Sequence, residues 1–149
     1  MAYLLTAGLL LGAASAAVGM TVDHQSRVDH HSGPVAAQYR GTIAVSHQQV
    51  GAVAPAGKMS TLRCRWAANM VVDRHAVAAS GATMTRQIER EAVLKGTRPG
   101  WCSTHRAAIA QEVADRAADM KGHLIDLAQE DHEALRNELD RIHGAQRAG

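Results

Sequence analysis

The last third of the chain carries an apolar residue at almost every third or fourth position, the pattern of one buried helix face. This stripe contains Ile109, Val113, Ala117, Met120, Leu124, Leu127, Leu135, Leu139 and Ile142. A helix from Ser103 to His143 would be about 60 Å long at 1.5 Å per residue. We expect Ser103 or Thr104 to cap it. A small domain does not cover such a length, so the helix must break, fold back near residues 129–132, or pair with another chain.

Upstream of this stripe, the side chains alternate between apolar and polar. Residues 38–50 and 61–73 have this period of two, which predicts half-buried strands. The second stretch also fits helical spacing, so a helix is the alternative there. We interpret residues 83–95 as a third strand that turns helical near Ala92. The predicted fold class is α+β, a small antiparallel meander over residues 38–92 packed on a long C-terminal helix, with an all-α fold as the alternative.

Residues 1–17 have the layout of an export signal peptide. A leucine-rich block is followed by small residues, and an Ala-x-Ala site predicts cleavage after Ala16 or Ala17. No basic residue precedes the block, which departs from the usual pattern. An uncleaved membrane anchor is the alternative, although the alanine- and glycine-rich second half is weakly hydrophobic. We therefore expect a periplasmic or secreted protein.

The chain has two cysteines, Cys64 and Cys102. An even number of cysteines in a small exported chain predicts a disulfide. Closing this loop would stabilise the fold by about 4 kcal/mol on the chain-entropy model. That contribution matters because the chain has no Phe and only 3% aromatic residues, which limits its core. Residues 38–149 are thus predicted to form a single disulfide-linked domain.

Nine histidines are many for a chain of 149 residues. Residues 18–37 are polar and turn-forming without a regular period, which predicts a flexible N-terminal segment. This segment contains His24, Asp29, His30 and His31, a set of imidazoles and carboxylates that suits zinc, copper or nickel. A metal-handling protein is therefore one functional alternative. The other interpretation is a solvated tail without fixed geometry.

Basic residues dominate before residue 107 and acidic residues after it, although the net charge is only +2. A basic sheet and an acidic helix could complement each other within the chain, or favour association between chains. Arg40, Arg63 and Arg65 lie on the polar side of the predicted strands. Arginines there would hold phosphate or carboxylate groups. The partner we expect is an anionic envelope component or a protein, and not a nucleic acid.

No motif assigns a catalytic residue. The sequence lacks a Gly-x-Ser-x-Gly elbow, a P-loop and a dinucleotide-binding fingerprint. We therefore predict a non-enzymatic binding or protein-interaction module with no cofactor beyond a divalent metal. Self-association is expected through Leu135, Leu139 and Ile142. A small extracytoplasmic hydrolase, or an inhibitor of one, is a further alternative.

Overall fold

The structure is a computed structural model that describes residues 19–147, so the predicted signal peptide lies outside the described residues. The elements are β1 (Met20–Val28), β2 (Val35–Val50), β3 (Arg63–Val77), β4 (Thr83–Pro99), α1 (Cys102–Asp115) and α2 (Ala117–Arg147). The four strands pair in chain order, each antiparallel to the next. The α+β prediction is confirmed, and the all-α alternative is wrong. Of residues 61–73, those from Arg63 onward belong to strand β3 and not to a helix.

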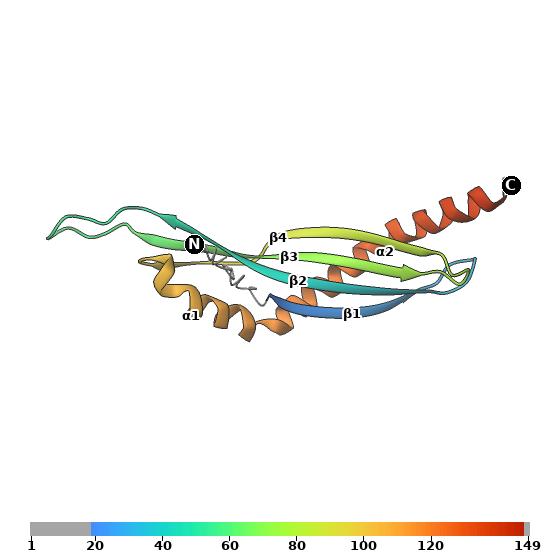
Figure 1. Ribbon diagram of the computed structural model, residues 1–149, viewed down its shortest axis with the longest axis horizontal. Coiled ribbons are helices and arrows are strands. Elements are labelled where there is room, and N and C mark those ends of the chain that lie inside the picture. The colour runs from blue at the N-terminus through green and yellow to red at the C-terminus, as the bar shows by residue number, and fades with distance from the viewer. Residues whose placement is uncertain (1–18, 148–149) are drawn as a thin grey trace, which may run out of the picture.

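The sheet is a long twisted ribbon with both helices on one of its faces (Figure 1). Strands β2, β3 and β4 contain 16, 15 and 17 residues. At roughly 3.3 Å per residue they reach about 50 Å, far beyond a typical strand. The loop between β2 and β3 projects past α1 at one end of the molecule. We call the side of the sheet that meets the helices the covered face, and the opposite side the open face.

The C-terminal helical stretch breaks once, at Arg116, and does not fold back near residues 129–132. The break lets α1 and α2 run in different directions along the covered face, and α2 crosses the sheet diagonally (Figure 1). We expected the helical stretch to be too long for the sheet to cover, but the sheet is longer than we predicted. Its strands are about as long as the 31-residue α2, which measures about 46 Å.

The covered face holds the apolar core. Alternate residues of β2 and β3 are buried there, as a strand with one face against helices requires. The helices contribute the predicted stripe, whose buried members are Ile109, Val113, Met120, Leu124, Leu127, Leu135 and Leu139. Ala117 is exposed because it lies at the helix break.

Residues 19–37, the described part of the segment 18–37 that we predicted to be flexible, are largely strand. Residues 20–28 form β1, which pairs along its whole length with β2. The alternation was hidden because two polar residues, His24 and Ser26, occupy inward positions between Val22 and Val28. Backbone pairing with a long neighbour and burial of the valines under α2 order this strand despite its polar composition. The sheet therefore has four strands instead of three.

A disulfide links Cys64 on β3 to Cys102 at the first residue of α1, as predicted, with their Cα atoms 4.8 Å apart. The expected caps Ser103 and Thr104 are wrong, because the N-cap position is Trp101, two residues before Ser103, and its side chain makes no capping hydrogen bond. Gln49 of β2 performs this role from outside the helix. Its Oε1 accepts a hydrogen bond from the Cys102 N–H at 2.7 Å, so the start of α1 is tied to the sheet twice.

Strand β4 contains a bulge where the sequence suggested a helical turn. Met70 pairs with Arg90 and Ala68 pairs with Leu94, so three residues of β4 lie opposite Asn69 alone. Ala92, at the centre of the bulge, has φ of 50°, and its N–H donates to Asn69 Oδ1 at 2.8 Å. The bulge lengthens β4 by two residues and leaves its inward and outward positions in phase.

Candidate functional site

The arginines that project from the sheet onto the covered face pair with acidic residues of the helices. The pairs are Arg74–Asp131, Arg74–Glu138, Arg86–Asp131, Arg90–Glu130 and Arg98–Glu112. The basic sheet and the acidic helices therefore complement each other within one chain. This was one of two explanations for the uneven charge, and the other was association between chains.

Asp131 is the centre of a buried ion network. One of its oxygens accepts hydrogen bonds from Tyr39 Oη at 3.0 Å and Arg74 Nη1 at 2.8 Å, and the other accepts from Arg86 Nη1 at 2.9 Å. Arg74 also donates to both oxygens of Glu138 at 2.8 Å. Burial, with the Asp131 charge second, raises the pKa of Tyr39 above its ordinary range. Arg74 and Asp131 are 1% and 4% exposed, so this network holds α2 on the sheet and is closed to a substrate.

Arg40, Arg63 and Arg65 all lie at outward positions of the open face, but the structure does not bring all three together. Arg40 lies about 26 Å along β2 from Gln48, the residue that pairs with Arg65. Its Nε donates to Asp23 on β1 at 2.9 Å, an exposed pair that raises the pKa of the guanidinium. Arg63 and Arg65 remain neighbours on the same face of β3.

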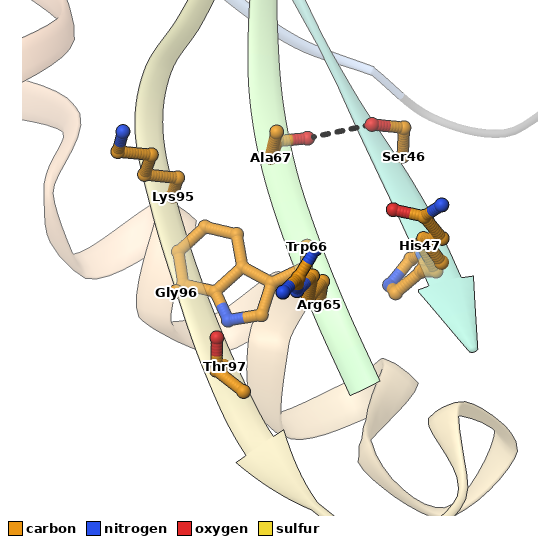
Figure 2. Close-up of a pocket in the computed structure, with 9 residues that line it drawn as sticks. Ser46, His47, Arg65, Trp66, Ala67, Lys95, Gly96 and Thr97 are labelled. Carbon is orange, nitrogen blue, oxygen red and sulfur yellow. Dashed lines mark hydrogen bonds between the residues drawn. The ribbon is translucent and has the colours of Figure 1, made fainter. Parts of the chain in front are cut away.

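A shallow groove of about 630 Å³ lies beside Arg65, where the open face of three strands is hollowed (Figure 2). Ser46 on β2 and Ala67 on β3 are small residues that lower its floor, and Ser46 Oγ donates to the Ala67 carbonyl at 3.3 Å. Arg65 and Lys95 stand at its sides, together with Gln48 and Thr97. We call this feature the basic groove.

The cations of the basic groove differ from those of the covered face in their partners. Arg65 and Lys95 line the groove, and Arg63, two positions before Arg65 on β3, lies outside its lining; all three side chains are exposed. None of them takes part in an ion pair within residues 19–147. Lys95 was not predicted as a site residue. It lies opposite Ala67, near Arg65, only because of the register of β4 across the bulge.

Two of the predicted metal ligands, His30 and His31, meet the C-terminal part of α2. They occupy the turn between β1 and β2, and their Nε2 atoms lie 2.9 and 3.7 Å from Asp140 Oδ1. The ring of His143 stands 5.7 Å from that of His30, centroid to centroid. We call these four residues the histidine cluster.

The other two predicted ligands do not join the histidine cluster. His24 projects inward from β1, opposite Tyr39, at 6.4 Å between ring centroids. Asp29 is exposed, and its nearest cation is Arg27 at 3.7 Å.

Asp140 holds the histidine cluster together electrostatically. The hydrogen bond from His30 is the largest cause of a lowered pKa for this carboxyl, and the charges of His30, His31 and His143 act in the same direction. Neither Asp140 nor His143 was singled out from the sequence as a partner of the turn. A useful signal was available, since the two residues are three positions apart and share one helix face.

The residues expected to mediate self-association belong to the core of one chain. Leu135 and Leu139 are fully buried against the sheet, and Ile142 is partly buried beside them. In this conformation their side chains are already packed within one copy.

No protein-family model matches this chain, and searches of curated proteins and of solved structures find no match either. Within residues 19–147, neither helix combines the length and the hydrophobicity that a membrane crossing requires. The function of this chain therefore has to be inferred from its own geometry.

Proposed function

We propose that this protein is a non-catalytic extracytoplasmic binding module, and that its basic groove holds an acidic segment of a partner protein. The observation that carries the proposal is the set of exposed, unpartnered cations around the groove. The arginines of the sheet that project onto the covered face are all engaged by acidic helix residues, whereas Arg65 and Lys95 in the groove, and Arg63 near it, form no ion pair within residues 19–147. Cations without a structural partner beside a hollow favour an anionic ligand.

The side chains of the groove suit carboxylates of a peptide better than a sugar chain. Arginine presents a planar fork that binds a carboxylate through two parallel hydrogen bonds. Gln48, Ser46 and Thr97 add polar groups that are able to bond a peptide backbone. Sugars are commonly bound by stacking on aromatic rings, but the one aromatic residue of the groove, Trp66, is only 4% exposed. An acidic peptide segment is therefore the occupant that we favour over an anionic polysaccharide.

The disulfide supports the extracytoplasmic location. Disulfides persist in oxidising compartments and are rare where thiols are kept reduced. The leucine-rich block of residues 1–17 supports the same location by a separate argument. Mass spectrometry of protein alkylated without reductant and recovered from the native host tests both points. We expect no labelled cysteine and an N-terminus near residue 17; an intact Met1 with two labelled cysteines would contradict the location.

Binding is tested with a fluorescently labelled decaglutamate peptide and anisotropy at low salt. We expect saturable binding that weakens as salt is added, because exposed charges are screened. Replacing Arg65 and Lys95 together by Ser should weaken the affinity at least tenfold. The matched control replaces Arg27 and Arg40 by Ser, which removes the same charge from the same face at a distance from the groove.

The two variants separate a site from general attraction. Equal losses in both would show that only net charge attracts the peptide, and the proposal would fail. Alginate serves as the polysaccharide arm. If alginate binds more tightly than the peptide, and does so through Arg65 and Lys95, the groove is a glycan site instead.

A further inference from the structure

The histidine cluster is assembled from two parts of the chain that are far apart in sequence. His30 and His31 come from the turn between β1 and β2, and Asp140 and His143 come from the C-terminal part of α2. The hydrogen bond between His30 and Asp140 spans 110 positions. His31 and Asp140 are 56% and 60% exposed at their side chains, so the apolar core does not depend on them.

The distances among His30, His31 and Asp140 are close to those around a transition-metal ion. One ligand atom each from His30, His31 and Asp140 lies within 4.8 Å of the other two. Neighbouring ligand atoms on a tetrahedral zinc lie about 3.4 Å apart, because each is about 2.0–2.2 Å from the metal. The separations of 2.9 and 3.7 Å between Asp140 Oδ1 and the two Nε2 atoms bracket this value.

The second ring nitrogens of two histidines have local partners, as in known metal sites. His30 Nδ1 lies 2.6 Å from Ser32 Oγ, and its side chain is 6% exposed. His143 Nδ1 lies 3.0 Å from the Leu139 carbonyl, so it carries the proton and leaves Nε2 as the lone-pair donor. Metal-binding histidines generally donate their other N–H to such an oxygen, which fixes the ring and its tautomer.

Ser32 can form a hydrogen bond with His30 Nδ1 in either tautomer of the ring, so the contact is kept with or without a metal on Nε2. Its backbone N–H is 3.2 Å from His30 Nδ1 and donates to that nitrogen when Nε2–H is bonded to Asp140. When Nε2 binds a metal, the ring proton is carried by Nδ1 and is donated to Ser32 Oγ.

We propose that His30, His31 and Asp140 bind one divalent transition-metal ion of the zinc class. His143 lies outside the close group of these three residues, with its ring centroid 5.7 Å from that of His30, and moves in as the fourth ligand when the ion binds. Imidazole nitrogens favour zinc, copper and nickel over magnesium and calcium, which prefer a full shell of oxygen atoms. The bound ion fastens the β1–β2 turn to the end of α2. This site lies at the opposite end of the sheet from the disulfide, and it does not depend on the function proposed for the basic groove.

Zinc binding is measured by isothermal titration of the full chain with ZnCl₂ in a non-chelating buffer. We expect one ion per chain and a rise in Tm of about 5–10 °C at a zinc concentration 100-fold above Kd. Cobalt provides an independent readout, because tetrahedral Co²⁺ bound by nitrogen and oxygen ligands has an intense visible spectrum.

Single substitutions locate the ion. His31→Ala, Asp140→Asn and His143→Ala should each weaken binding at least tenfold, and Ser32→Ala about 10–100-fold through the loss of its hydrogen bond. The matched control is His123→Ala, an exposed histidine elsewhere on α2, which should leave the affinity unchanged. Circular dichroism of each variant confirms that the fold is retained.

The outcomes decide each part of the proposal. Unchanged affinity in His31→Ala and Asp140→Asn would overturn the site, and so would an equal loss in His123→Ala, the sign of adventitious chelation. Full affinity in His143→Ala alone would overturn the assignment of the fourth ligand.

Discussion

The two faces of the sheet use the same residue type in opposite ways. On the covered face, Arg74 is fully buried and bonded to two carboxylates of α2. On the open face, Arg65 is exposed beside a groove and has no acidic partner within residues 19–147. The two arginines lie nine positions apart on one strand, and because nine is odd their side chains project from opposite faces of the sheet. An arginine of this sheet therefore either stabilises the fold or stays available for a ligand, and the face from which its side chain projects decides between the two.

The covered face shows how a chain without Phe secures a long helix. Its core combines aliphatic residues and methionines with two aromatic residues, Tyr39 and Trp66, and α2 is also held by the buried ion network. The disulfide fastens α1 at one end of the sheet. The open face makes no comparable contribution to the fold.

Loss of the central carboxylate of the buried ion network should have the largest effect on stability. Asp131→Ala leaves Arg74 buried beside only Glu138 and removes the acceptor of Tyr39. We expect the free energy of unfolding to fall by about 3–5 kcal/mol, the cost of breaking a buried ion pair. Urea denaturation followed by circular dichroism measures it. Asp119→Ala, which breaks an exposed pair with Arg116, is the control and should change stability by less than about 0.5 kcal/mol.

Loss of the disulfide should have the next largest effect. The double substitution Cys64→Ser and Cys102→Ser should lower the free energy of unfolding by about 2–4 kcal/mol, because the unfolded chain gains freedom. Thermal unfolding with and without reductant checks this in the wild type. Reductant should not change the Tm of the double variant; a change would mean that the reductant acts elsewhere.

A smaller effect is expected from His132 on the covered face, whose Nε2 lies 3.1 Å from Ser26 Oγ. Burial is the main cause of its lowered pKa; Arg136 and His24 also lower it, whereas Asp131 opposes them. The unfolded chain therefore binds more protons than the folded one as the pH falls below about 6.5, so stability decreases in that range.

Substitution of His132 isolates this contribution. His132→Gln keeps a polar partner for Ser26 and should reduce the loss of stability between pH 7.5 and 5.5, measured by urea denaturation. Some loss should remain, because burial also lowers the pKa of His47. His123→Gln, on an exposed part of α2, should behave like the wild type. A pH dependence identical in all three proteins would show that His132 does not contribute.

Much of the covered face was predictable because its signals are local. The apolar stripe of α2 repeats with the helical period, and the two cysteines needed only to be counted. Strand β1 was missed because His24 and Ser26 interrupt its alternation. Strand length was missed as well, because residues 38–50 showed no sign that pairing would begin at Val35.

The sites on the surface were less predictable because they depend on register and on length. The histidines of the turn were recognised, but Asp140 meets them only because β1 and α2 together span the sheet to the same end. Lys95 lies opposite Ala67, two positions along β3 from Arg65, through the register set by the bulge at Ala92. Neither relation follows from sequence spacing alone.

The central claim is that the unpaired cations at the basic groove serve binding, whereas the arginines of the covered face serve the fold. Its most direct test measures unfolding free energy and decaglutamate affinity for two variants. Arg65→Ser with Lys95→Ser should lose at least tenfold in affinity while stability changes by less than about 0.5 kcal/mol. Arg86→Ser, which removes a partner of Asp131, should lose about 1 kcal/mol of stability and keep its affinity. If the groove variant is destabilised while its affinity stays the same, the division between the two faces is wrong.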